Sequence, residues 1–255
     1  MAVKAQKPSP TLDEDRRAGG GAIDTGPFTP PPEPATRPAL TTELDPRRST
    51  YVSIFGRKGS GKSFLASRLF ARYPFDKVVI DPSGDAEGVD DAELLTAPLP
   101  AKLPKGEQGR PRTWRFIPDA GADDFRDDLD RVIGLAMHHP RGRCALWLDE
   151  LNLVSPGPNQ TGPNLRRALY MGRHHGLTMF ACGPRPMTID PLVLSQADHV
   201  AIFQLPNPND RRRVADAIGI GPKEFDAWHE QIGEREFFWY DARAHDAVIL
   251  PPLKK

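Results

Sequence analysis

The chain has 255 residues, enough for one sizeable domain with a buried core, and it balances 34 Lys and Arg residues against 34 Asp and Glu residues. This zero net charge excludes a general attraction to nucleic acid or acidic membrane, so a polyanion would have to bind at a local basic patch. The absence of any run of about 18 apolar residues excludes a membrane-spanning helix. Two cysteines cannot form a disulfide scaffold and no secretory signal is visible, so we expect a cytoplasmic protein.

Residues 1–48 have the composition of a disordered tail. Prolines at positions 30–32 and 34 lie among glycines and polar residues, with few aliphatic side chains. Such a segment cannot bury enough apolar surface to offset its chain entropy. It is either a plain spacer or an arm that docks a partner, and we assign the folded domain to residues 49–255.

Apolar strands alternate with helices through the folded part. We expect strands at 51–55, 77–80, 113–117, 144–148, 177–182 and 199–203, and helices at 64–72, 124–139, 165–173 and 210–218. A β-hairpin is predicted at 237–240 and 247–250. Strands that are apolar throughout are typical of a parallel sheet covered by helices on both faces.

A phosphate-binding loop follows the first expected strand. The segment from Gly56 to Ser63 fits G-x-x-x-x-G-K-[ST] at every fixed position, between a buried strand and a helix. Its glycines let backbone N–H groups surround phosphates, Lys62 should bridge the β- and γ-phosphates, and the Ser63 hydroxyl should ligate Mg²⁺. The predicted nucleotide-binding residues are Gly56, Gly59, Ser60, Gly61, Lys62 and Ser63. We therefore predict an α/β fold of the P-loop NTPase (RecA/ASCE-like) class, with ATP and Mg²⁺ as cofactors.

Two acidic residues end the strand at 144–148. Asp149 should emerge at the carboxyl end of a central strand, beside the phosphate loop, where it can hold the water shell of Mg²⁺. Glu150 has the reach to polarise an attacking water, which makes it the expected catalytic base. An Asp-Glu pair at this place favours a hydrolysing ATPase over most kinases and GTPases.

Three further segments resemble the FtsK/HerA superfamily of DNA-pumping ATPases. They are V-I-D-P-S-G-D at 79–85, M-G-R-H-H-G-L-T at 171–178, and A-C-G-P-R-P at 181–186 followed by the stretches 196–203 and 209–211. An Arg-His pair in the second segment is familiar from viral genome-packaging ATPases and from zonula-occludens-toxin-like phage proteins. The resemblance covers residues 50 to about 215.

The resemblance implies roles for two further positions. Arg173 is expected to be an arginine finger that stabilises phosphoryl charge in a neighbouring subunit, an effect of about 10³–10⁵ in rate where it operates. One alternative is that Arg173 is an arginine at a helix C-terminus that pairs with the helix dipole, and another is that Arg166, Arg167 or Arg185 is the finger. At the end of the strand 177–182 the family usually has a polar sensor, whereas this chain has Cys182, Gly183 and Pro184. This departure predicts slower hydrolysis or a sensor elsewhere.

A basic segment at 97–115 leads into the strand at 113–117 and is expected to be an exposed loop. It holds Lys102, Lys105, Arg110, Arg112 and Arg115 against the single acid Glu107. In a ring ATPase such a loop could contact DNA phosphates without reading bases. The alternative is a solvated insertion.

Together these features predict an ATP-hydrolysing DNA translocase that acts in a homo-oligomeric ring, a hexamer by resemblance. A viral, phage or plasmid DNA-packaging motor fits best, with double-stranded DNA as substrate and a capsid or portal protein as a further partner. It would work in the host cytoplasm or on the virion, without membrane insertion. Two rivals remain: a zonula-occludens-toxin-like assembly or extrusion ATPase, and a nucleotide-switched binding protein with little turnover.

Overall fold

The computed structural model describes residues 45, 48–105, 110–119, 121–157 and 160–254. Almost all of the predicted tail at 1–48 therefore lies outside the described residues, as does part of the basic segment at 97–115. Within the described part, no helix is both long enough and apolar enough to cross a bilayer.

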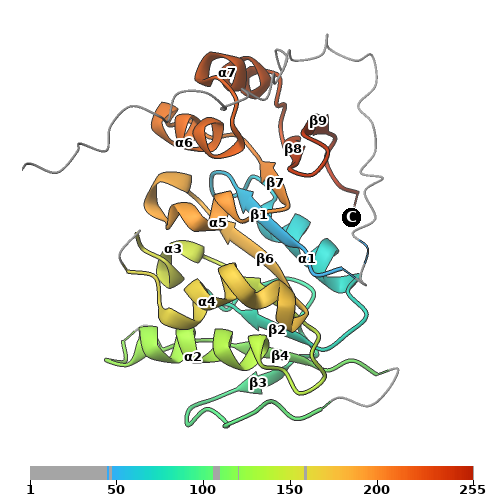
Figure 1. Cartoon of the computed structure of the whole chain (residues 1–255), viewed down its shortest axis with the longest axis vertical. Helices are drawn as coiled ribbons and strands as arrows, with labels where there is room; N and C mark the ends of the chain where they lie inside the picture. Colours follow the sequence, from blue (N-terminus) through green and yellow to red (C-terminus); the bar gives the residue numbers. More distant parts are fainter. Residues whose placement is uncertain (1–44, 46–47, 106–109, 120, 158–159, 255) are drawn as a thin grey trace, which may run out of the picture.

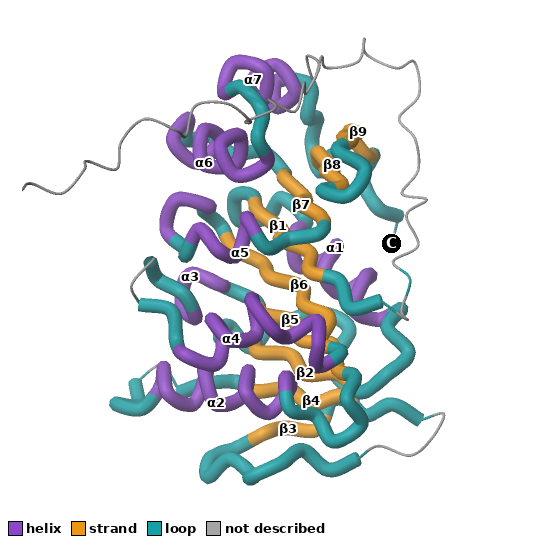
Figure 2. The backbone as a smooth tube through the Cα atoms, in the orientation of Figure 1, coloured by secondary structure: helices purple, strands orange, loops and turns teal. Residues whose placement is uncertain are grey.

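A single twisted sheet forms the centre of the described part, in the order β3-β4-β2-β5-β6-β1-β7-β8-β9. Its strands are β1 (Tyr51–Phe55), β2 (Lys77–Ile80), β3 (Glu93–Leu95), β4 (Thr113–Phe116), β5 (Cys144–Leu148), β6 (Leu177–Gly183), β7 (His199–Ile202), β8 (Phe237–Asp241) and β9 (Asp246–Leu250). The pairs from β3 to β7 are parallel, and β8 and β9 add an antiparallel hairpin. Figure 2 shows these strands as one continuous layer from β3 to β9. The expected parallel sheet and terminal hairpin are confirmed.

Helices cover the sheet on two faces. They are α1 (Lys62–Ala71), α2 (Phe125–Met137), α3 (Leu151–Val154), α4 (Pro163–Met171), α5 (Pro191–Ser195), α6 (Pro208–Ile218) and α7 (Pro222–Glu230), with 3-10 turns at Gly172–His175 and Pro186–Thr188. One core cluster joins the sheet to α2, α4, α5, α6 and α7, and a second joins its other face to α1. Figure 1 shows α1 on the opposite side of the sheet from α2 and α4.

The two cysteines are separate buried thiols. Cys144 pairs in register with Leu177 at the start of β6, whereas Cys182 lies near the end of that strand. Both are free, which confirms that neither takes part in a disulfide.

Every parallel strand ends at the same edge of the sheet, so the loops that follow β1, β2 and β5 meet there. The same topology sends the segments that precede β1, β5, β6 and β7 to the opposite edge. These two edges carry different chemistry, and we call them the carboxyl edge and the amino edge.

Candidate nucleotide site and arginine network

The phosphate loop lies at the carboxyl edge, between β1 and α1. Gly59 and Gly61 adopt φ values of +78° and +108°, a region that favours glycine, and Gly61 caps the start of α1. Gly56 is required for a different reason, because a Cβ there would lie 2.5 Å from the Cβ of Phe203. The tight packing of Phe203 against the loop thus fixes its path.

Polar groups of the loop are available to a ligand. Among the described residues, Lys62 Nζ donates only to the backbone oxygen of Arg57, over 3.2 Å, and the side chain remains partly exposed. The Ser60 hydroxyl is buried and has no hydrogen-bond partner among the described residues. Because a buried donor without a partner is costly, this hydroxyl favours a bound oxygen-rich ligand in the loop.

The acidic end of β5 lies against the loop, as the sequence predicts. The Ser63 hydroxyl donates to Asp149 Oδ1 over 3.4 Å. Burial, together with the nearby carboxylates of Glu150 and Asp81, raises the pKa of Asp149 to about 6, although Lys62 acts in the opposite direction. A divalent cation would offset this repulsion between acids.

Two more carboxylates complete an oxygen cluster that the site list from the sequence missed. Single oxygens of Asp81, Asp85 and Asp149 all lie within 4.8 Å of one another. Asp81 is fully buried and follows β2, the neighbour of β5, so the topology brings it to this place. Carboxylate and hydroxyl oxygens suit Mg²⁺, and the residues present therefore fit that ion. The signal in the sequence is the I-D-P segment at the end of β2.

Glu150 has a strained backbone. It adopts φ 48° and ψ 54°, a left-handed conformation that costs a non-glycine residue about 1–3 kcal/mol. The turn moves the chain directly from β5 into α3 and leaves the Glu150 side chain half-buried beside Asp149. Strain at this position is consistent with a functional constraint, because a glycine would adopt the same turn without cost.

A pocket of about 370 Å³ continues from the phosphate loop toward the terminal hairpin. Its walls include Lys62 and Ser63 on one side and Phe203, Arg235 and Pro252 on the other. The last three residues were not predicted as site residues, since nothing in their local sequence marks them. They come together because β7, β8 and β9 follow β1 in the order of the sheet.

Arg173 lies at the amino edge, far from the phosphate loop of its own chain. Its guanidinium stacks over the ring of Tyr51 at 4.1 Å, at the start of β1, whereas the loop follows the end of that five-residue strand. At about 3.3 Å per residue, the length of the strand separates the two by roughly 15 Å. Arg173 therefore cannot reach the phosphates bound by its own chain.

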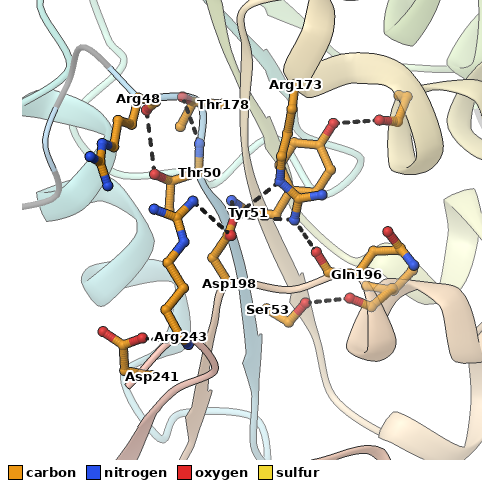
Figure 3. A network of polar contacts seen from close by, with 12 residues as sticks. Arg48, Thr50, Tyr51, Ser53, Arg173, Thr178, Gln196, Asp198, Asp241 and Arg243 are labelled. Carbon is orange, nitrogen blue, oxygen red and sulfur yellow. Dashed lines mark hydrogen bonds and ion pairs between the residues drawn. The ribbon is translucent and has the colours of Figure 1, made fainter. Parts of the chain in front are cut away.

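An ion-pair network holds Arg173 in place. Its Nε and Nη2 donate to Asp198 Oδ2 over 3.2 and 3.1 Å, and Nη2 also donates to the carbonyl of Gln196. Figure 3 shows this network, in which Arg243 contacts the other oxygen of the same carboxylate. Arg173 lies in the last turn of the 3-10 helix Gly172–His175, and its specific contacts are with the segment before β7 and with the ring of Tyr51 in β1.

The basic segment differs from the expected open loop. Arg115 lies in β4 and donates to the buried Asp81 from Nε over 2.9 Å, and Arg112 donates to Glu93 over 2.7 Å. Both arginines are therefore paired within the chain. Lys102 and Lys105 are exposed, and residues 106–109 lie outside the described residues.

The chain matches no protein-family model. It is similar to the DNA packaging ATPase P9 of Enterobacteria phage PRD1, with 24% identity over 220 residues that cover 82% of this chain and 89% of that protein.

Solved structures share the fold. The genome packaging NTPase B204 of Sulfolobus turreted icosahedral virus 2 in complex with AMP superposes with a TM-score of 0.65, at 21% identity, over 83% of this chain and 100% of that one. VirB4 of Thermoanaerobacter pseudethanolicus gives 0.60 at 12% identity, over 84% and 92% of the two chains. In sequence, this chain is thus similar to a phage DNA packaging ATPase, and it shares its fold with a viral genome packaging NTPase and with VirB4.

Proposed function

We propose that the chain is the ATP-hydrolysing subunit of a motor that packages viral, phage or plasmid DNA. The observation that carries the proposal is the contact between Ser63 and Asp149, which joins the phosphate loop to the acidic end of β5. The similarity to the PRD1 packaging ATPase supplies the link to DNA. The B204 protein has also been solved in complex with ATP-gammaS, which supports ATP as the nucleotide.

The residues at the carboxyl edge have separate tasks in this proposal. The loop N–H groups and the ammonium of Lys62 bind the β- and γ-phosphates, helped by the positive end of α1. Ser63 and Asp149, with Asp81 and Asp85 nearby, would hold Mg²⁺, which when bound neutralises phosphate charge and polarises the γ-phosphate. Glu150 accepts the proton of the attacking water.

The pocket beside Phe203 and Arg235 has the place and size for the rest of the nucleotide. It opens directly from Lys62 and Ser63, so a nucleotide anchored by its phosphates would extend into it. Apolar contacts from Phe203 and Pro252 would cover the base. Such contacts do not need hydrogen bonds to the edge of the base.

The ring is a proposal that follows from the position of Arg173. Since Arg173 cannot reach the phosphates of its own chain, a finger role requires a second copy, and the family resemblance suggests six. Double-stranded DNA is the proposed substrate, and a capsid or portal protein a further partner. Such a motor would work in the host cytoplasm or on the virion.

A nucleotide-switched binding protein is the second candidate. Cys182 takes the place where the resembled family has a polar sensor, and its side chain is completely buried. Burial raises the pKa of the Cys182 thiol well above its usual range, so it stays neutral and is a poor sensor of a γ-phosphate. Slow or absent turnover would favour this candidate.

The ATPase rate of the purified chain, measured with and without double-stranded DNA, tests the proposal. We expect turnover that DNA stimulates, and its loss in Lys62→Ala, because the phosphates lose their cationic partner. Lys58→Ala is the matched control, since Lys58 is an exposed residue of the same loop and should leave turnover unchanged. ATP binding without turnover would favour the switch, and an active Lys62→Ala variant would contradict the site.

A further inference from the structure

Arg115 pairs with a carboxylate that lies at the nucleotide site. It belongs to β4, in register with Val79 of the neighbouring strand β2, and its guanidinium reaches the turn that follows β2. There Nε donates to Asp81 Oδ2 over 2.9 Å, and Nη2 donates to the same oxygen. The Arg115 side chain is 14% exposed and the Asp81 side chain is fully buried. Unlike the exposed cations of the basic segment, Arg115 is thus turned into the molecule.

Asp81 holds the turn at 82–87. Its Oδ1 accepts a hydrogen bond from the Gly84 N–H over 2.9 Å, and its Oδ2 accepts one from the Ala86 N–H over 3.1 Å. Gly84 has φ +74°, a left-handed value that favours glycine in a tight turn. A carboxylate has about four lone-pair sites, and these two amides and the two guanidinium N–H groups supply as many donors. Asp81 therefore has little capacity left for a metal ion.

The same turn places Asp85 beside the metal-binding residues. The Asp85 side chain is exposed, and one of its oxygens lies within 4.8 Å of an Asp149 oxygen. The Ser83 hydroxyl donates to Asp85 Oδ1 and so fixes this carboxylate from within the turn. Asp85 and Glu87 also line the pocket that continues from the phosphate loop. Among the described residues Asp85 accepts no other hydrogen bond, so it retains acceptor sites for the Mg²⁺ that Asp149 would hold.

We propose that Arg115 is a positioning residue for the Mg²⁺-bound nucleotide, because it fixes Asp81, and Asp81 fixes the turn that presents Asp85. This inference rests on the proposed function, since its ligand is the metal-bound nucleotide. A guanidinium suits the task because its planar N–H donors set the direction of a carboxylate, whereas a lysine ammonium supplies charge without that direction. Without Arg115, the buried Asp81 would lose its counter-ion and tend to take up a proton, so its hydrogen bonds with the two amides of the turn would weaken.

Titrations of a non-hydrolysable ATP analogue at a series of Mg²⁺ concentrations test this role on the DNA-free chain. Arg115→Ala should raise the Mg²⁺ concentration needed for half-maximal binding at least about tenfold, the lower end of the usual effect of residues that orient metal ligands. Binding in excess chelator should change little. Arg112→Ala is the matched control and should need no extra Mg²⁺, because Arg112 pairs with Glu93 of the edge strand β3, which does not line the nucleotide pocket. An unchanged Mg²⁺ requirement in Arg115→Ala, or an equal loss with and without the ion, would overturn the role.

A double-mutant cycle shows whether Arg115 acts through Asp85. Asp85→Asn alone should raise the Mg²⁺ requirement by a similar factor, because a neutral amide oxygen binds the cation more weakly than a carboxylate does. Adding Arg115→Ala to Asp85→Asn should then raise the requirement little further, since the carboxylate that Arg115 positions is already lost. Two effects that multiply would show that Arg115 reaches the metal by another route, and the proposal would fail.

Amide hydrogen exchange of the nucleotide-free chain tests the positioning independently of the proposed function. In Arg115→Lys, the milder substitution if Arg115→Ala does not fold, the Gly84 and Ala86 amides should exchange several times faster than in the unmodified chain. The Met179 amide, which donates to the Thr50 carbonyl, should exchange as before. Equal exchange at Gly84 and Ala86 would overturn the positioning. If the unmodified chain binds no nucleotide, the proposed function fails, and the exchange rates still decide whether Arg115 holds the turn.

Discussion

The Ser63 hydroxyl donates a hydrogen bond to Asp149 Oδ1 over 3.4 Å, although the two residues are 86 positions apart. The contact exists because β1 and β5 both flank β6 and end at the same edge of the sheet. It unites the residue after the phosphate-loop lysine with the carboxylate at the end of β5.

The first prediction concerns this pair. Ser63→Ala should weaken nucleotide binding at least about tenfold in Mg²⁺ but change it little in excess chelator, since the hydroxyl acts through the metal. Asp149→Asn should behave in the same way, with weaker nucleotide binding in Mg²⁺ and little change in chelator. Nucleotide titrations with and without Mg²⁺ check both, and an equal loss in chelator would show that these side chains act on the phosphates instead.

Glu150→Gln should retain nucleotide affinity and lose hydrolysis at least about a hundredfold, within the usual range for a general base, because an amide cannot accept the proton of the water. Glu150→Gly should be equally inactive but more stable, since glycine relieves the left-handed conformation at φ 48°. Turnover assays and melting temperatures check these variants. A hydrolytically active Glu150→Gln would assign the base to another residue.

Gly56→Ala should destabilise the chain by about 1–3 kcal/mol, the usual cost of overpacking. The new methyl group would lie 2.5 Å from Phe203 Cβ and 2.8 Å from Ser60 Oγ. The Cβ of Phe203 is fixed to the backbone, so the clash cannot be relieved by rotation of that side chain. Gly157→Ala is the matched control, because nothing lies within 4 Å of a Cβ there. Denaturant unfolding measures both, and equal stabilities would contradict the tight packing of Phe203 on the loop.

A pH dependence is expected from His229. Its Nε2 accepts a hydrogen bond of 2.7 Å from the Leu205 N–H, and burial, aided by Arg211, lowers its pKa from 6.5 to about 4. Between these values the unfolded chain binds a proton that the folded chain does not, so stability falls as the pH drops from 6.5 toward 4.

The variant His229→Gln checks this dependence, because glutamine can accept a hydrogen bond but does not titrate. Its melting temperature should fall less steeply than that of the unmodified chain over the same pH window. Because other groups titrate in both proteins, only the difference between the two profiles is informative. Parallel profiles would show that His229 is protonated equally in the folded and unfolded chains.

Local pattern was sufficient to predict the parallel strands and the main helices. Continuous apolar runs such as 144–148 and 177–182 are buried on both faces, and the structure confirms these strands. The edge strand β3 was missed because Glu93 and Leu94 are exposed, so its three residues carry no periodic signal. The helix α7 was missed as well, since it begins at a proline and has a largely polar surface.

The candidate site was predictable only where a motif is contiguous. Lys62, Ser63 and Asp149 were found because a short pattern surrounds each one. Asp198, in contrast, is an ordinary acid before β7, and its contacts with Arg173 and Arg243 depend on the order of strands in the sheet. Local sequence patterns do not specify the order of the strands, so these contacts could not be predicted from them.

The last prediction tests whether Arg173 serves a neighbouring subunit. Arg173→Ala should bind ATP normally, because Lys62 and Ser63 lie at the opposite edge, but hydrolyse it at least about a hundredfold more slowly. Tyr51 and Asp198 lose a partner in this variant, so its melting temperature must be measured as well. Arg173→Lys is a control that retains the charge but loses the fork of donors to Asp198 and Gln196.

Mixing two inactive variants separates action between subunits from action within one. Arg173→Ala copies combined with Glu150→Gln copies should recover part of the activity, because some junctions then pair an intact Glu150 with an intact Arg173 from the next copy. If Arg173 served its own chain, every site would lack either its base or its arginine. Co-assembly must be demonstrated separately, for instance by pull-down of differently tagged copies. The opposing result would be mixed rings that form and are able to hydrolyse ATP at single sites, without any return of activity. That result would leave Arg173 only its structural pairing with Asp198.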